Sequence, residues 1–280
     1  MNRDIHSIDS AARLHEAVIK LGVLPFFKNT IEGWSVEELT QELHWFGDEN
    51  SGGSLGPWDW KIDVIREEDV IYGKFFQRKA VFMTEEWFRH LMNYRRNDPF
   101  YQMATSGTYV PKNQADRLMK YLSPTLLSYI QKNGTVETGS IKKYLTDNVP
   151  ESIRARVGGA MNKYLFPTVK KQAIDSLVQY LQMGTWIVTS DFERVRRGTD
   201  LQYSRWQRSY LSSAELILSP AATPSDEPSW VRMFREQTKD DELSITVPDC
   251  SPEESYLILR NQIAEITGEQ DIRKLDKILK

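Results

Sequence analysis

The chain has 280 residues, a net charge of −3, and a composition that is 40% hydrophobic and 27% charged. These values are ordinary for a globular protein and exclude a disordered or collagen-like chain. The longest apolar runs are far shorter than the roughly 20 residues that cross a bilayer, and the first ten residues lack the apolar stretch of a signal peptide. We therefore expect a cytoplasmic protein without a membrane partner.

One cysteine and four histidines limit the redox and metal chemistry of the chain. Cys250 has no partner for an internal disulfide, and the scattered histidines lack the His-x-x-x-His spacing of a helical zinc site. The sequence shows no Gly-rich phosphate loop, nucleophile elbow or Ser/His/Asp arrangement. We therefore expect neither a metal nor a cofactor, and no catalytic residue is assigned.

The charge is distributed unevenly along the chain. Residues 111–210 hold 16 Lys+Arg and 8 Asp+Glu, a net +8, whereas residues 1–110 hold 12 and 17 (−5) and residues 211–280 hold 8 and 14 (−6). A basic middle third favours an anionic partner there. The predicted domains are an aromatic-rich N-terminal domain (1–110), a basic module (111–212), and an acidic linker with C-terminal helices (213–280).

The first third is predicted to contain helices and one hairpin. The helices are expected over residues 9–29 with an interruption at Pro25, 35–46, 58–68 and 84–96, and the strands over 70–72 and 79–83. Ser35 followed by Glu38 has the spacing of a capping box, and the Gly-rich stretch 51–54 predicts a loop. This order fits a small winged-helix-like unit, although other α+β folds share it.

The middle third predicts three helices followed by a hairpin. The helices are expected over residues 123–134, 138–145 and 168–182, and the strands over 186–189 and 203–210. Residues 194–200 between the strands are rich in arginine. This is the order of a winged helix, in which the third helix enters the major groove of DNA and the hairpin lies along the backbone. Residues 149–167 form a longer connection than a tight turn requires.

Cationic residues of this module are the candidates for DNA contact. Their cations would neutralise phosphates, while Gln172 or an arginine could read a base edge. The candidates are Lys142, Lys143, Lys170, Lys171, Gln172, Arg194, Arg196, Arg197, Arg205 and Arg208. Strand alternation sends Arg205 and Arg208 to opposite faces, so they cannot all meet one duplex. Solvated surface charge is the alternative explanation.

The last part of the chain begins with an acidic, Pro- and Ser-rich stretch typical of a surface linker. Two helices are predicted after it, over residues 251–267 and 270–279. The whole chain is thus predicted to be a helix-rich α+β protein of tandem winged-helix-like units, with short β-hairpins and a C-terminal helical segment.

Several strings in the chain resemble the AlkZ-related proteins, which are distant relatives of bacterial DNA glycosylases. They lie at residues 33–38, 57–61, 72–80, 86–88, 93–96 and 187–203. The similarity covers most of residues 30–212. The resemblance implies tandem winged helices and a role on alkylated or crosslinked DNA.

One motif of the related glycosylases is missing from the N-terminal region. Those enzymes carry Gln-x-Gln or Gln-x-Asp there, to position the water that attacks the sugar carbon. Here the nearest match is Gln114-Ala115-Asp116, just ahead of the middle module, where a polar helix start explains it better. The resemblance therefore leaves base excision open.

Aromatic residues are concentrated in the first third. Most such residues form cores, but some could stack an extruded base or line a ligand pocket. Trp58 and Trp60 are the candidates for a pocket because they follow the Gly-rich loop.

Three functions remain open. The leading hypothesis is a winged-helix DNA-binding protein that recognises duplex or damaged DNA. The first alternative is a divergent glycosylase that excises alkylated or crosslinked bases, with another residue replacing the missing motif. The second is a protein-interaction or ligand-sensing module that uses the aromatic third, and arginines dispersed over several faces would favour it.

Overall fold

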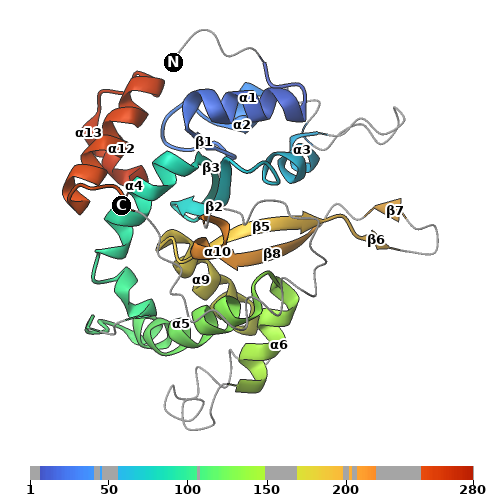
Figure 1. Ribbon diagram of the computed structural model, residues 1–280, viewed down its shortest axis with the longest axis vertical. Helices are drawn as coiled ribbons and strands as arrows, with labels where there is room; N and C mark the ends of the chain where they lie inside the picture. Colours follow the sequence, from blue (N-terminus) through green and yellow to red (C-terminus); the bar gives the residue numbers. More distant parts are fainter. Residues whose placement is uncertain are drawn as a thin grey trace.

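The computed structural model describes residues 7–40, 45, 56–105, 108–148, 169–197, 202–203, 207–218 and 247–279. Within these ranges the protein is a helix-rich α+β structure with small antiparallel sheets (Figure 1), as predicted. The predicted connection 149–167 and most of the predicted linker after residue 218 lie outside the described residues.

The first unit is built around a three-stranded antiparallel sheet with the strand order β1-β3-β2. Its elements are α1 (Ala11–Leu21), β1 (Val23–Pro25), α2 (Val36–Leu39), α3 (Pro57–Val64), β2 (Val70–Phe76) and β3 (Lys79–Thr84). Phe76 pairs with Lys79, so two residues close the predicted hairpin. Both turn residues, Gln77 and Arg78, have positive φ angles of 50° and 63°, as a type I′ turn requires.

The helix predicted over residues 9–29 ends eight residues early. Ser10 accepts a hydrogen bond from Arg13 N and starts α1, and Gly22 ends it in the left-handed conformation with φ 71°. A Cβ on Gly22 would lie 2.2 Å from the indole Nε1 of Trp87, so this position requires glycine. The chain then enters β1, a strand that the sequence analysis missed.

Ser35 caps the helix as predicted, but the carboxylate of Glu38 accepts from Gly33 N rather than from Ser35 N, and the helix is shorter than predicted. Glu38 N donates to Ser35 Oγ at 3.3 Å, and Gly33 N donates to Glu38 Oε1 at 3.0 Å. The helix stops at Leu39, whose carbonyl accepts a hydrogen bond from Ile8 N at 2.9 Å. A tertiary contact therefore uses a carbonyl that a longer helix would need.

The second unit follows α4 (Glu85–Arg96) and the short 3₁₀ helix η2 (Tyr101–Ala104). Its elements are α5 (Gln114–Asn133), β4 (Val136–Glu137), α6 (Thr138–Asn148), α9 (Val169–Met183), β5 (Ile187–Glu193), β6 (Arg196–Arg197), β7 (Gln202–Tyr203), β8 (Arg208–Ser213) and α10 (Ala214–Leu218). The sheet order is β4-β8-β5, so this unit repeats the connectivity of the first.

The first helix of this unit starts earlier than predicted. Asn113 caps α5 by accepting a hydrogen bond from Asp116 N at 2.9 Å, which confirms the polar helix start around Gln114. Ser123 is therefore not a cap: it lies inside the helix and donates to Met119 O at 2.5 Å. Pro124 also lies inside the helix.

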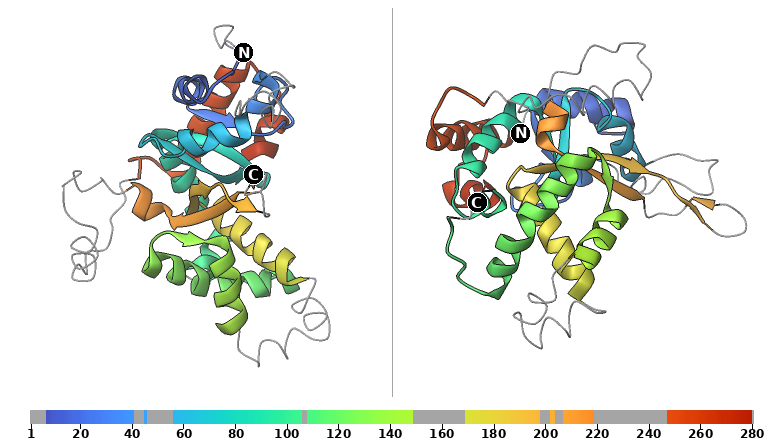
Figure 2. Two further views of the ribbon diagram at one scale, coloured as in Figure 1. Left: turned by 90° about the vertical axis from the view of Figure 1, so that its right-hand side faces the viewer. Right: turned by 60° about the horizontal axis from the view of Figure 1, so that its bottom comes forward.

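The predicted hairpin is present, with its second strand displaced. β8 pairs with β5 from Arg208 to Ser213 rather than over residues 203–210, and the register shifts between Thr189 and Asp191. Tyr203 belongs instead to β7, which pairs with β6. Figures 1 and 2 show the β6–β7 ribbon projecting away from the body of the protein.

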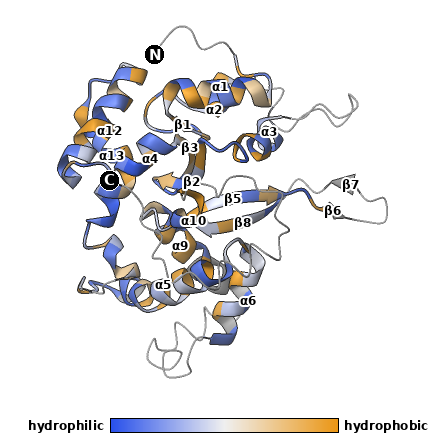
Figure 3. Ribbon diagram, viewed as in Figure 1, coloured by the Kyte–Doolittle hydropathy of each residue, from blue (hydrophilic) through white to orange (hydrophobic). Residues whose placement is uncertain are grey.

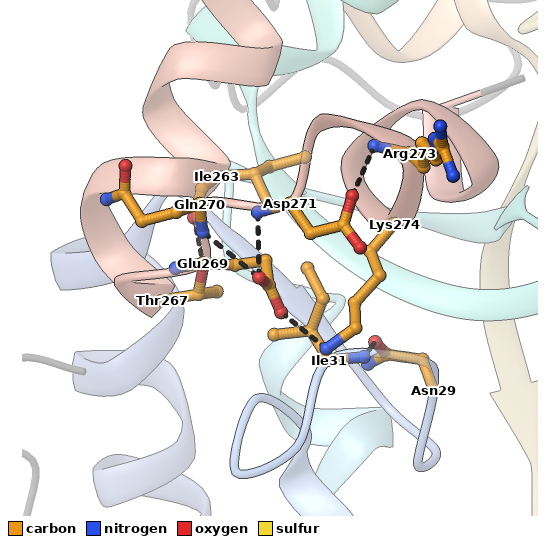
Figure 4. Close-up of polar contacts among 9 residues, drawn as sticks. All are labelled: Asn29, Ile31, Ile263, Thr267, Glu269, Gln270, Asp271, Arg273 and Lys274. Atoms are coloured by element: carbon orange, nitrogen blue, oxygen red, sulfur yellow. Dashed lines mark hydrogen bonds and ion pairs between the residues drawn. The ribbon is translucent and has the colours of Figure 1, made fainter.

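Both predicted C-terminal helices are present, as α12 (Pro252–Thr267) and α13 (Ile272–Leu279). They return to the first unit, where α12 lies beside α4 (Figure 1). At the turn between them, Glu269 accepts from Asp271 N at 2.9 Å and pairs with Lys274 Nζ at 2.9 Å, next to the loop of Asn29 and Ile31 (Figure 4). The backbone amide of Asp271 lowers the pKa of Glu269. These contacts join the start of α13 to the turn that follows α12.

Two cores hold the structure together. The first combines the first unit with α12 and α13 and includes Val188 and Leu218 of the second unit; the second lies among α5, α6 and α9. Figure 3 shows both hydropathy colours on the amphipathic helix α1, and mainly hydrophobic colour on β3. The shared residues join the two units.

Candidate functional site: a polar cluster between the two units

The two units meet where β2 and α3 lie against the hairpin of the second unit (Figure 1). Gln182 of α9 is 2% exposed; its Oε1 accepts from Lys74 N of β2 at 3.0 Å. The rings of Tyr72 and Phe192 lie 5.9 Å apart. This contact places residues 59–61 of α3 against the end of β5 and the start of β8.

Lys61 is the most unusual residue of this interface, because it is a lysine that is only 1% exposed. Its Nζ donates to Trp58 O at 2.7 Å and to Gln207 Oε1 at 2.6 Å. The same atom lies 3.6 Å from the ring centroid of Trp58 and 4.5 Å from that of Phe192. Two neutral acceptors and two aromatic faces thus surround the amine.

The surroundings of Lys61 lower its pKa to about 7. Burial is the main cause, because it disfavours the charged ammonium, and the positive charge of Arg194 adds to it. The carboxylate of Asp59 acts in the opposite direction and raises the pKa. A lysine with this pKa is part amine and part ammonium near neutral pH.

Asp59 is held by two partners from the second unit. Its Oδ1 accepts from Arg194 Nε at 2.9 Å and from Gln207 Nε2 at 3.2 Å. The Asp59 side chain is 19% exposed and that of Arg194 is 30% exposed, so the ion pair is partly shielded from water. We call Trp58, Asp59, Lys61, Phe192, Arg194 and Gln207 the interface cluster.

The interface cluster brings together an amine, a carboxylate and a carboxamide. These groups can donate or accept protons and orient a small polar ligand. No motif in the sequence links Lys61, Asp59 and Gln207, so they were not predicted as a group. The sequence contains one indication that Lys61 could be buried. It lies between Trp60 and Ile62 in a short helix, so its amine must either reach water or be buried with polar partners.

Six of the ten predicted DNA contacts lie in α9, α6 and β6. Lys170, Lys171 and Gln172 lie in the first turn of α9, Lys142 lies in α6, and Arg196 and Arg197 form β6; the side chains of all six are outside the described part of the structure. Arg205 lies outside the described residues as well.

The remaining cationic candidates have described side chains. Lys143 is exposed on α6. Arg208 is half-exposed and lies 3.5 Å from Glu193, whereas Arg194 is engaged by Asp59 in the interface cluster. The structure therefore gives Arg194 an intramolecular partner that the sequence did not reveal.

The two tryptophans predicted as pocket residues have different surroundings. Trp60 is 7% exposed and belongs to the first core. Trp58 is partly buried, with its ring 6.1 Å from that of Phe26 and next to Lys61. Of the two, Trp58 is the one at the interface cluster.

The described ranges contain neither a candidate metal site nor a helix that could span a membrane. No three His, Cys, Asp or Glu side chains gather there in a way that could hold a metal ion. None of the helices in the same ranges combines the length and apolar character needed to cross a bilayer.

The fold and the interface cluster define a two-unit α+β protein whose units repeat one connectivity and meet through a buried polar cluster. A family model described as "AlkZ related" matches residues 8–280, so the chain belongs to the AlkZ-related family. The match extends the predicted resemblance through the C-terminal helices. No curated protein and no solved structure shows a match.

Proposed function

We propose that this protein binds DNA through its second unit, acting as a winged helix that recognises duplex or damaged DNA. The observation that carries the proposal is the order α5-β4-α6-α9-β5-β8, with strand order β4-β8-β5. This is the connectivity of a winged helix, whose third helix enters the major groove. Here that helix is α9, which begins close to Lys170, Lys171 and Gln172.

The charge of the second unit supports the proposal. Its net +8 over residues 111–210 lies between acidic segments, so the attraction to phosphates would be local. The projecting β6–β7 ribbon carries Arg196 and Arg197, the position from which a wing reaches a neighbouring backbone (Figure 2). Membership of the AlkZ-related family favours damaged DNA as the target.

Mobility shifts at two or more salt concentrations would test this function, with duplex, single-stranded and lesion-bearing probes. Each phosphate contact contributes about 0.9 to the slope of log K against log salt, so K170A/K171A should lower the slope by about 2. Lys20→Ala, an exposed lysine on α1 of the first unit, is the matched control and should leave the slope unchanged. Absence of binding to every probe at low salt would contradict the proposal.

Base excision is the second candidate function, and the interface cluster favours it. Asp59 and Gln207 form a hydrogen-bonded carboxylate and carboxamide beside the amine of Lys61, groups able to orient a water molecule. Incubation with alkylated or crosslinked DNA, scored for abasic sites, tests this function. Release by the wild type but not by Asp59→Asn is expected, and release no greater than in buffer would argue against it.

A further inference from the structure

The amine of Lys61 lacks the carboxylate partner that normally keeps a buried lysine charged. No acidic oxygen lies within 4 Å of Nζ among the described residues, and its two hydrogen-bond acceptors are neutral. The nearby Asp59 is directed at Arg194 and Gln207 instead. This arrangement favours the uncharged amine, which carries a free electron pair.

We propose that Lys61 Nζ forms an imine with an aldehyde, and that the aldehyde is the ring-opened deoxyribose of an abasic site in DNA. The choice of an abasic site rests on the proposed function, because such a site is both a DNA lesion and the product of base excision. The amine chemistry itself rests only on the environment of Lys61.

The step is a condensation that needs no oxidant or reductant. The electron pair of Nζ attacks the aldehyde carbon C1′, a carbon–nitrogen bond forms, and the carbonyl electrons move to oxygen. A proton passes from nitrogen to that oxygen, which gives a carbinolamine. Loss of one water molecule then leaves the imine.

The surroundings of Lys61 would make its amine more reactive toward an aldehyde than the amines of the other lysines. With its pKa lowered to about 7, a large share of its amines is uncharged at pH 7, against about one in three thousand for a lysine of ordinary pKa. The uncharged fraction of Lys61 at pH 7 is therefore about a thousand times that of a lysine of ordinary pKa. Trp58, which is partly buried and lies against Nζ, is the cover that an aldehyde must displace.

Borohydride trapping tests the DNA part of the proposal. Wild-type protein is incubated with an abasic duplex and sodium borohydride, which reduces the imine to a stable amine, and the crosslinked peptide is mapped by mass spectrometry. Crosslinking at Lys61 is expected, with at least a tenfold loss in Lys61→Arg and no loss in Lys74→Arg, an exposed lysine of β2. Crosslinks at other lysines, or none in protein that still shifts the same probe, would overturn it.

A reaction with a small aldehyde tests the amine chemistry of Lys61 independently of the proposed DNA binding. Reductive alkylation of the full chain with glycolaldehyde and cyanoborohydride at pH 7 requires no DNA binding. Lys61 should be modified at least tenfold faster than Lys74, and mapping in the wild type makes the result independent of whether a variant folds. Equal rates at the two lysines would overturn the amine chemistry. Selective modification in a protein that binds no DNA would support it while the proposed function fails.

Discussion

The two units have the same connectivity, but their corresponding helices α3 and α9 contact the other unit in different ways. In the first unit, the third helix, α3, is covered by the hairpin of the second unit through Lys61, Asp59 and their partners. In the second unit, the corresponding helix, α9, contacts the first unit near its C-terminal end, where Gln182 reaches β2. Among the described residues, α9 thus meets the first unit near its C-terminal end, whereas α3 meets the second unit in its first turn.

The hairpins account for this difference. The first hairpin closes in two residues at Gln77 and Arg78, and Gln77 Nε2 donates to Lys277 O of α13. The second hairpin continues past β5 and β8 into the β6–β7 ribbon. The first hairpin is short and its turn is held by α13, whereas the second covers α3 along its base and projects at its tip (Figure 1). Repeated topology thus produces one structural unit and one candidate DNA-binding unit.

The largest loss in the free energy of unfolding is expected from Arg95→Met. Arg95 is 1% exposed and donates to Tyr101 OH at 2.8 Å, to Met183 O at 3.0 Å and to Leu279 O, so it joins α4 to the C-terminal ends of α9 and α13. Its loss leaves buried acceptors unsatisfied and should lower the free energy of unfolding by about 3 kcal/mol or more, measured by urea denaturation.

Arg13→Met is the matched control for that variant. Its side chain is 51% exposed and pairs with Glu16 at 2.8 Å, so a change below about 0.5 kcal/mol is expected. Similar losses in the two arginine variants would show that Arg95 does not join the units as described.

A smaller effect is expected from Gln182→Leu. Leucine cannot accept the hydrogen bond from Lys74 N, and the unsatisfied amide should lower the free energy of unfolding by about 1–3 kcal/mol. Gln179→Leu, on a partly exposed position of the same helix, is the control and should change stability much less. Equal effects, measured in the same urea titration, would mean that the contact between β2 and α9 does not depend on this bond.

Lys61 should make stability depend on pH. Its pKa is about 7 in the folded protein and near 10.5 when unfolded, so between these values the unfolded chain binds more protons. The free energy of unfolding should therefore rise with pH over this range, by at most about 1.4 kcal/mol per pH unit.

Comparison with Lys61→Met isolates this contribution. Melting temperatures of the two proteins are measured from pH 6.5 to pH 9. Any stability advantage of Lys61→Met at pH 6.5 should shrink as the pH rises, because the native amine no longer has to carry a buried charge. A difference between the proteins that stays constant over this range would rule out the lowered pKa.

The smallest effect on stability is expected at the exposed ion pair of the second hairpin. Arg208 and Glu193 are each about half-exposed and 3.5 Å apart, so Arg208→Ala should change stability by less than about 0.5 kcal/mol. If Arg208 contacts a phosphate, the same variant should reduce the salt slope of DNA binding by about 0.9. Glu193→Gln, which removes the competing carboxylate, should strengthen binding, and an unchanged slope in Arg208→Ala would exclude this contact.

Local patterns predicted much of the fold. The N-cap at Ser35, the strands around residues 70–83 and the last two helices follow from short-range chemistry, because caps and hydrophobic periodicity act within a few residues. Errors arose where a distant contact intervened. The helix after Ser35 stops where Ile8 takes the Leu39 carbonyl, and the 9–29 helix ends at Gly22, beside Trp87.

The sequence by itself determined the family, the α+β class and the basic middle third, since all three depend on residue types and their order. Only the tertiary structure showed that Lys61 and Gln207, 146 positions apart, share a hydrogen bond and that Arg194 is paired with Asp59. Residues so distant come together through the packing of two units, and no pattern within either segment encodes that packing. The burial that lowers the pKa of Lys61 arises there as well, because desolvation depends on the surrounding atoms rather than on neighbours in the chain.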